Sequence, residues 1–130
     1  MSASDVVILD ASAALAYVFD EEGGERTRAE IDCAAISAAN WAEVMEKAIA
    51  ADIDDRSLRG DFEGLGARVV SVDAEQAEHA ARMREVTRGL GLSLADRLCF
   101  ALAAARDAPV LTADRAWAKI DLGVEVRLIR

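Results

Sequence analysis

Four acidic residues stand in otherwise apolar segments of this chain and could together bind a divalent cation. They are Asp10, Glu43, Asp96 and Asp114. Bringing carboxylates together in a poorly hydrated place is costly unless a cation or shared protons neutralise their charge. A hard cation such as Mg²⁺ prefers oxygen ligands. The sequence therefore predicts a metal site, provided that folding gathers the four side chains.

The elements that must position these side chains are short apolar runs separated by helical segments. We expect strands at residues 6–9, 33–37, 69–72, 110–112 and 124–129, and helices at 11–19, 25–31, 40–51, 54–65, 73–87, 94–107 and 115–120. Such alternation is typical of a three-layer α/β/α sandwich with a mainly parallel sheet of about five strands. The length of 130 residues fits a single domain, residues 1–130.

A parallel sheet would bring the four acids to one edge. Parallel strands end at a common edge, where the following helices begin, and this places Asp10, Glu43 and Asp114 there. The helix that carries Asp96 leads into the strand at 110–112 and must run antiparallel to it, so its start lies at the same edge. Helix starts carry partial positive charge, which favours ionised carboxylates.

Helix capping is the alternative interpretation of each acid. Asn40 to Glu43 and Ser93 to Asp96 both have the spacing of a capping box, and Asp10 and Asp114 could be plain caps. Capping is the commoner role for one such acid taken alone. Four caps, however, need not share an edge or lie in apolar surroundings, so the set as a whole favours a metal site. Asp10 is the strongest candidate, because four apolar residues precede it.

The charge of this chain limits the classes of molecule that it could bind. The net charge of −9 argues against a general affinity for nucleic acid, although two divalent cations would reduce it to −5, since −9 plus 4 is −5. Arg97 and Arg115 directly follow proposed ligands and could contact RNA phosphates; the alternative for each is a surface ion pair. Ser12 and Thr112 could orient the carboxylates, or could cap helices.

Other residue types offer little further chemistry. We expect Cys33 and Cys99 to be buried free thiols, His79 to lie on a solvated helix face, and Trp41 and Trp117 to pack in the core. Leu94, Leu98 and Leu102 share one face of their helix at ordinary core spacing. The start of the chain lacks a basic secretion signal, and no apolar stretch is long enough to span a bilayer, so we expect a soluble, cytoplasmic protein without a membrane partner.

In their order and spacing, the four acidic segments resemble the PIN domain, and in particular VapC-type toxins of toxin–antitoxin pairs. Asp10-Ala-Ser12 after a strand, Glu43 on a helix, Asp96 in a leucine-containing segment and Thr112-Ala-Asp114 after a buried strand match the family pattern. The resemblance implies a PIN-like fold and an Mg²⁺- or Mn²⁺-dependent ribonuclease. It also implies a homodimer held inactive by a cognate VapB-type antitoxin.

The residues themselves can support hydrolysis of RNA by a water molecule. Asp10, Asp96 and Asp114 would bind the metal directly or through water, and Glu43 would bind metal or accept a proton. A catalytically silent PIN-like interaction module is one alternative. A phosphoacceptor signalling domain is another, although its usual lysine after a late strand is absent, since Lys47 and Lys119 are the only lysines.

Overall fold

The computed structural model describes residues 5–130 and is built on a five-stranded sheet, as the sequence predicts. The strands are β1 (Val7–Leu9), β2 (Ala34–Ser37), β3 (Arg68–Val70), β4 (Val110–Thr112) and β5 (Val126–Leu128). Their order is β3-β2-β1-β4-β5, and all four pairings are parallel. The three central strands are wholly buried, which explains why they are apolar except for Ser37 and Thr112, the last residues of β2 and β4.

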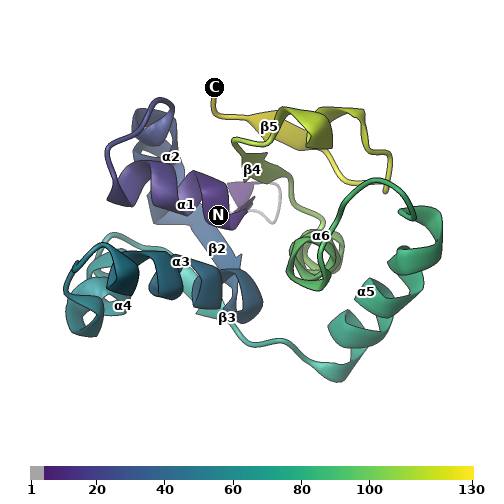
Figure 1. Cartoon of the computed structure of the whole chain (residues 1–130), viewed down its shortest axis with the longest axis horizontal. Helices are drawn as coiled ribbons and strands as arrows, with labels where there is room; N and C mark the ends of the chain where they lie inside the picture. The colour runs from purple at the N-terminus through teal and green to yellow at the C-terminus, as the bar shows by residue number, and fades with distance from the viewer. Residues whose placement is uncertain (1–4) are drawn as a thin grey trace.

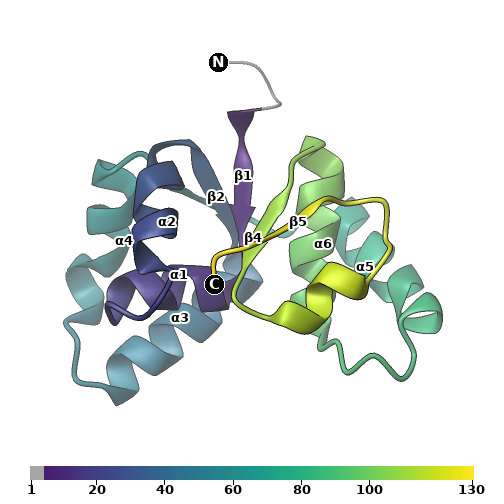
Figure 2. The same ribbon diagram turned by 90° about the horizontal axis from the view of Figure 1, so that it is seen from above.

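Helices cover both faces of this sheet. They are α1 (Ala11–Val18), α2 (Gly24–Glu30), α3 (Ala38–Ala50), α4 (Asp55–Gly64), α5 (Ala74–Val86) and α6 (Leu94–Arg106), with short 3₁₀ helices η2 (Ile31–Cys33) and η3 (Arg115–Lys119). Figures 1 and 2 show α1 to α4 on one side of the sheet and α5 and α6 on the other. The arrangement confirms the predicted three-layer α/β/α sandwich.

Two apolar cores follow from the alternation of side chains along the strands. Leu9 points into the core beneath α1 to α4, where Trp41 and Phe62 meet edge to face with ring centroids 5.2 Å apart. Ile8 points into the opposite core, where Phe100 packs on Trp117. Both tryptophans are buried, as predicted.

Close packing of α1 and α2 depends on one glycine. A Cβ at Gly24 would lie 2.4 Å from the carbonyl oxygen of Ala16, so a larger residue would push the helices apart. The hydroxyl of the fully buried Thr27 donates to the carbonyl of Ala13 at 2.9 Å and joins the same two helices. This pair of helices forms one wall of an apolar surface pocket.

Some local predictions from the sequence are wrong. Helix α3 begins two residues earlier than expected, because Ser37 caps it by accepting from the backbone N–H of Ala39 at 3.2 Å. Asn40 is therefore inside the helix and caps nothing. Cys33 is only half-buried, unlike Cys99, and Leu94 is 56% exposed although Leu98 and Leu102 are in the core. His79 lies on an exposed helix face as expected. None of the helices in residues 5–130 combines the length and apolar character needed to cross a bilayer.

Candidate active site

Asp10 is the buried centre of the candidate site. It follows β1 directly, caps α1, and is only 6% exposed. Its Oδ1 accepts from the backbone N–H of Ala11 at 2.8 Å, while Oδ2 accepts from the hydroxyls of Ser12 at 2.7 Å and Thr112 at 2.8 Å. The carboxylate is thus held in one orientation by groups from α1 and from the strand β4, which pairs with β1.

The two hydroxyls are themselves oriented by the backbone. Ser12 Oγ accepts from the N–H of Ala113 at 2.9 Å, and Thr112 Oγ1 accepts from the N–H of Asp114 at 3.0 Å. Because these N–H groups donate to the hydroxyl oxygens, both hydroxyl protons are free to point at Asp10. Neither side chain caps a helix, so that alternative for Ser12 and Thr112 is wrong.

Glu43 and Asp96 approach the site from two other helices. Glu43 lies in the second turn of α3 and is half-buried; within residues 5–130 its carboxylate accepts no hydrogen bond. Asp96 lies in the first turn of α6 and forms the predicted capping box with Ser93. The N–H of Ser93 donates to Asp96 Oδ2 at 2.9 Å, and Ser93 Oγ accepts from the N–H of Asp96 at 3.1 Å.

The charges of Asp10, Glu43 and Asp96 act on one another. Burial raises the pKa of Asp10, the hydroxyls of Ser12 and Thr112 oppose that rise, and the negative charge of Asp96 adds to it. Burial also raises the pKa of Glu43, and the charges of Asp10 and Asp96 raise it further. The fully buried thiol of Cys99 has its pKa raised by burial first and then by all three acids. These three carboxylates therefore occupy one neighbourhood.

Asp114 differs from the other three acids. It is exposed and caps η3, with Oδ1 accepting from the N–H of Ala116 at 3.0 Å. It is not among the main charges that raise the pKa of Asp10 or Glu43. Its backbone is nevertheless tied to the site through Thr112. The predicted edge of the sheet thus contains all four residues, with Asp10 buried, Glu43 and Asp96 half-buried and Asp114 exposed.

The donor set suits a hard divalent cation without forming a closed cage. Among residues 5–130, no three Asp, Glu, His or Cys side chains are close enough together to hold one ion between them. Mg²⁺ keeps several waters and is commonly bound by one or two carboxylates plus substrate phosphates. Asp10 and Asp96, with Glu43 beside them, offer only oxygen donors, and their mutual repulsion would be relieved by a bound cation.

Asn40 belongs to the site, although its place in the sequence predicts a cap. Its side chain is completely buried, and Nδ2 donates to the carbonyl of Ala95 at 3.1 Å, directly before Asp96. Its Oδ1 has no hydrogen-bond partner. Asn40 thereby links the helix of Glu43 to the start of the helix of Asp96. The sequence does carry a signal for this burial, because Asn40 lies four residues before Val44 and eight before Ala48 and so shares their buried helix face.

Replacing Asn40 by alanine is expected to destabilise the protein by about 1–3 kcal/mol, because a buried hydrogen bond is removed and a small cavity remains. Asn40→Asp should cost more at neutral pH, since it adds a buried negative charge beside three others. Urea denaturation at pH 7 measures both. Glu46→Ala, on the exposed face of the same helix, is the control and should change the free energy of unfolding little. Equal stabilities for Asn40→Ala and Glu46→Ala would contradict the expectation.

The two arginines beside the acids are placed differently. Arg97 is half-buried, and its Nη1 donates to the carbonyl of Ala80 at 2.8 Å, which joins α6 to α5. Arg115 is exposed at the start of η3. Within residues 5–130 neither forms an ion pair. The surface ion pairs offered as the alternative role are thus absent from this part of the chain.

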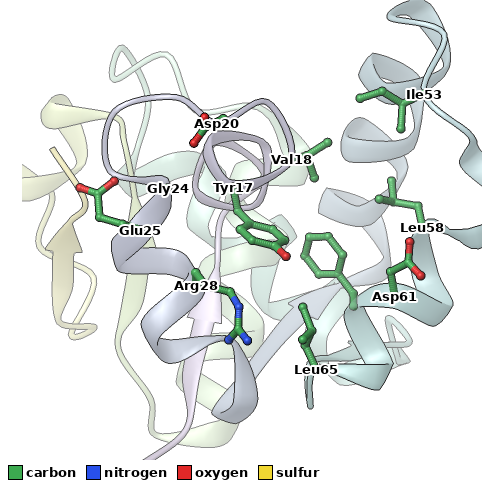
Figure 3. Close-up of a pocket in the computed structure, with 11 residues that line it drawn as sticks. Tyr17, Val18, Asp20, Gly24, Glu25, Arg28, Ile53, Leu58, Asp61 and Leu65 are labelled. Carbon is green, nitrogen blue, oxygen red and sulfur yellow. The ribbon is translucent and has the colours of Figure 1, made fainter.

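A separate apolar pocket of about 660 Å³ lies between α1, α2 and α4. Figure 3 shows Tyr17, Leu58 and Leu65 around it, with Arg28 from α2 at its side. Tyr17 packs edge to face on Phe62, with centroids 5.8 Å apart. Charged residues of both signs stand at the pocket, namely Asp20, Glu25, Arg28 and Asp61. Such a pocket on the face away from α5 and α6 offers a surface for an apolar side chain of a partner.

Comparison with known folds supports the architecture over the whole chain. A toxin-antitoxin complex from Klebsiella pneumoniae contains a chain with TM-score 0.75 and 18% identity, covering 95% of this chain and 98% of that one. DNA-bound VapBC from Salmonella typhimurium has a TM-score of 0.74 and 20% identity, covering 96% of this chain and 98% of that one. VapBC-5 from Mycobacterium tuberculosis has a TM-score of 0.57 and 24% identity, covering 97% of this chain and 98% of that one. The comparison with curated proteins gave no match.

The sequence itself matches one protein family. The match extends over residues 7–122 and so includes β1 with Asp10, the helices with Glu43 and Asp96, and the segment with Asp114. It agrees with the family resemblance of the four acidic segments and with the observed sheet order. The chain therefore belongs to the PIN domain family.

Proposed function

We propose that this protein is a metal-dependent endoribonuclease of the VapC toxin type, which hydrolyses RNA phosphodiester bonds. The observation that carries the proposal is the convergence of Asp10, Glu43 and Asp96 at one edge of the sheet: Asp10 is bonded to Thr112 at the end of β4, and Asn40 ties the helix of Glu43 to the start of the helix of Asp96. The raised pKa values of Asp10 and Glu43 agree with it. Membership of the PIN domain family and likeness to chains of toxin–antitoxin complexes support it.

Asp10 and Asp96 would hold Mg²⁺ or Mn²⁺, and Asp114 would reach the ion through water, because no three acidic side chains in residues 5–130 lie close enough to bind one ion directly. Glu43 would bind the ion or act as a base. Such an ion supplies Lewis-acid activation of water and neutralises charge on the phosphate. Ser12 and Thr112 hold the Asp10 carboxylate in a fixed orientation, and Ser93 does the same for Asp96. The raised pKa of Glu43 makes it a better proton acceptor than an ordinary carboxylate near neutral pH.

The test is incubation of the pure protein with several RNA classes in Mg²⁺, in Mn²⁺ and in excess chelator. Cleavage is expected with either metal and none with chelator. Cleavage that persists undiminished in chelator would reject the metal-dependent mechanism. Absence of cleavage of every RNA under all conditions would favour the catalytically silent interaction module instead.

We propose a VapB-type antitoxin as the protein partner, bound through the apolar pocket between α1, α2 and α4. Support comes from the similar solved structures, which are toxin–antitoxin complexes, and from the apolar and mixed-charge character of the pocket. A partner helix could place apolar side chains beside Tyr17 and Phe62 while its charges meet Arg28 and Asp61. The candidate partner is the product of any small reading frame immediately upstream of this gene.

Ile53→Glu is expected to weaken antitoxin binding about 10- to 100-fold, because it puts an unpaired charge into this apolar pocket. Ile49→Glu is a matched control: Ile49 is 53% exposed and does not line the pocket. Isothermal titration calorimetry measures both affinities, and RNA cleavage by the free proteins should be unchanged. Equal weakening by the two changes would place the antitoxin elsewhere.

We also propose that the protein is a homodimer, as the family resemblance implies. Light scattering on the eluate of a sizing column gives the mass directly, and a monomer at every accessible concentration would contradict the proposal.

A further inference from the structure

A second pocket, of about 640 Å³, lies in the connection between α5 and α6 and has an unusual charge for this protein. Arg84, Arg88 and Arg97 line it together with Thr87, Ser93 and apolar or glycine residues, and no acidic residue does. Four further pockets within residues 5–130 each include at least one Asp or Glu. A pocket lined by three cations and no acid, on a chain of net charge −9, favours an anionic ligand.

This arginine pocket adjoins the candidate active site. Ser93 belongs to both, because it lines the pocket and its N–H donates to Asp96 Oδ2 at 2.9 Å. Arg97 follows Asp96 directly in α6, and its bond to the carbonyl of Ala80 fixes one end of its guanidinium. The pocket therefore includes the residue that bonds the carboxylate of Asp96 and the residue that follows Asp96 in α6.

The other two arginines are available to a ligand. Arg84 is exposed, and no ion pair involves it within the described part of the chain. Arg88 pairs with Glu85 at 2.9 Å, but both side chains are about three-quarters exposed, so the pair is weak and exchanges readily for a phosphate. Arginine suits phosphate because its planar fork binds two oxygens at once.

The loop also exposes apolar side chains beside these cations. Leu90 is 51% exposed and Leu94 is 56% exposed. Gly89 and Gly91, at φ values of +83° and +73°, give the loop a left-handed backbone that presents Leu90 at its tip. Apolar surface next to guanidinium groups suits a nucleic acid whose bases are unstacked, which is a property of single strands.

We propose that the arginine pocket is a subsite for the phosphodiester backbone of single-stranded RNA next to the bond that is cut. The inference rests on the proposed ribonuclease function and adds where the substrate lies. Arg84, Arg88 and Arg97 bind phosphates, and Leu90 and Leu94 lie against the adjoining bases. The subsite resolves a conflict in the sequence, because an acidic protein with an acidic active site would otherwise repel its substrate.

The test compares Arg84→Gln/Arg88→Gln with Arg59→Gln/Arg82→Gln, which removes the same charge from exposed positions outside the pocket. Binding of a labelled single-stranded RNA is measured by fluorescence anisotropy in an Asp10→Asn background, with Mg²⁺ present and the salt concentration varied. The pocket variant should bind at least about tenfold more weakly at low salt. Its plot of log affinity against log salt concentration should be less steep by about 1.4, which is about 0.7 for each of the phosphates that the two arginines no longer neutralise. In protein that keeps Asp10, the Arg84→Gln/Arg88→Gln change should lower kcat/KM for RNA cleavage by the same factor.

Each result bears on one proposal separately. A wild-type protein that cleaves RNA, with equal affinities and salt slopes for the two double variants, would overturn the subsite and leave the ribonuclease proposal standing. Weakened antitoxin binding with unchanged RNA affinity would make the pocket a protein-docking surface and would also overturn it. Loss of RNA binding only in the pocket variant supports the subsite, whereas a wild-type protein that cleaves nothing rejects the proposed function through the cleavage assay alone.

Discussion

Asp10→Asn is expected to lower the rate of RNA cleavage by about 100- to 1,000-fold or more, a loss typical of removing one essential electrostatic group from an active site. The amide has nearly the same shape as the carboxylate but no negative charge, so it is a poor ligand for Mg²⁺ or Mn²⁺. Its single amide oxygen can accept either from the N–H of Ala11, as Oδ1 does, or from the hydroxyls of Ser12 and Thr112, as Oδ2 does, but not from both. The measurement is the initial rate of cleavage at saturating metal.

The fold of this variant should be unchanged, which makes the loss interpretable. Asparagine also caps helices, so its oxygen can keep the hydrogen bond from the N–H of Ala11 at the start of α1. The hydrogen bonds from the two hydroxyls are then lost, and removal of a buried charge offsets that loss. We expect the free energy of unfolding to stay within about 1 kcal/mol of the wild type. Asp54→Asn is the matched control, because Asp54 also caps a helix, α4, but is exposed and away from the site. Full activity in Asp10→Asn, or equal losses in both variants, would remove Asp10 from the mechanism.

Much of the fold could be predicted because the strong signals are local. The run that contains β1 is wholly apolar since both of its faces are buried, and Pro109 and the glycines separate the elements. The alternation of strands and helices then leaves few topologies, and a parallel sheet brings Asp10 and Asp114 to one edge. The direction of α6 places Asp96 there as well. For this reason four residues far apart in the sequence could be assigned to one region.

The details that failed depend on rotation and register, which local patterns do not determine. Ser37 and Asn40 are both good caps, and only packing of α3 on the sheet decides that Ser37 caps and Asn40 is buried. Leu94 has core spacing, but it lies in the first turn of α6 and is exposed. Asp114 has the same local setting as Asp10, yet its neighbours leave it in solvent. The exposure of side chains at the ends of helices and strands could therefore be learned only from the structure.

Mg²⁺ or Mn²⁺ is expected to raise the Tm of the wild-type protein, and to raise it more at pH 7 than at pH 5. The folded-state pKa values of Asp10 and Glu43 lie above their ordinary values of 3.8 and 4.5. Stability from such groups is fully present below the ordinary pKa and is lost as the pH rises through the folded-state pKa. As the pH rises, more of the carboxylates in the metal-free site are ionised and repel one another, and a cation that binds them restores stability. As the pH falls, protons compete with the metal for the same carboxylates.

Metal at ten times its Kd should contribute about 1.4 kcal/mol, which corresponds to a rise of about 4 °C in Tm for a domain of this size. Thermal unfolding is followed by circular dichroism at both pH values, with NaCl added to match ionic strength. Asp54→Asn should show the wild-type shift and Asp10→Asn little or none. Because other groups also titrate between pH 5 and pH 7, the quantity to compare is the difference between these two variants at each pH. An equal shift in Asp10→Asn, or a shift that is the same at both pH values, would mean that the cation binds outside the coupled carboxylates. Since the readout is stability, the result does not depend on the proposed cleavage of RNA.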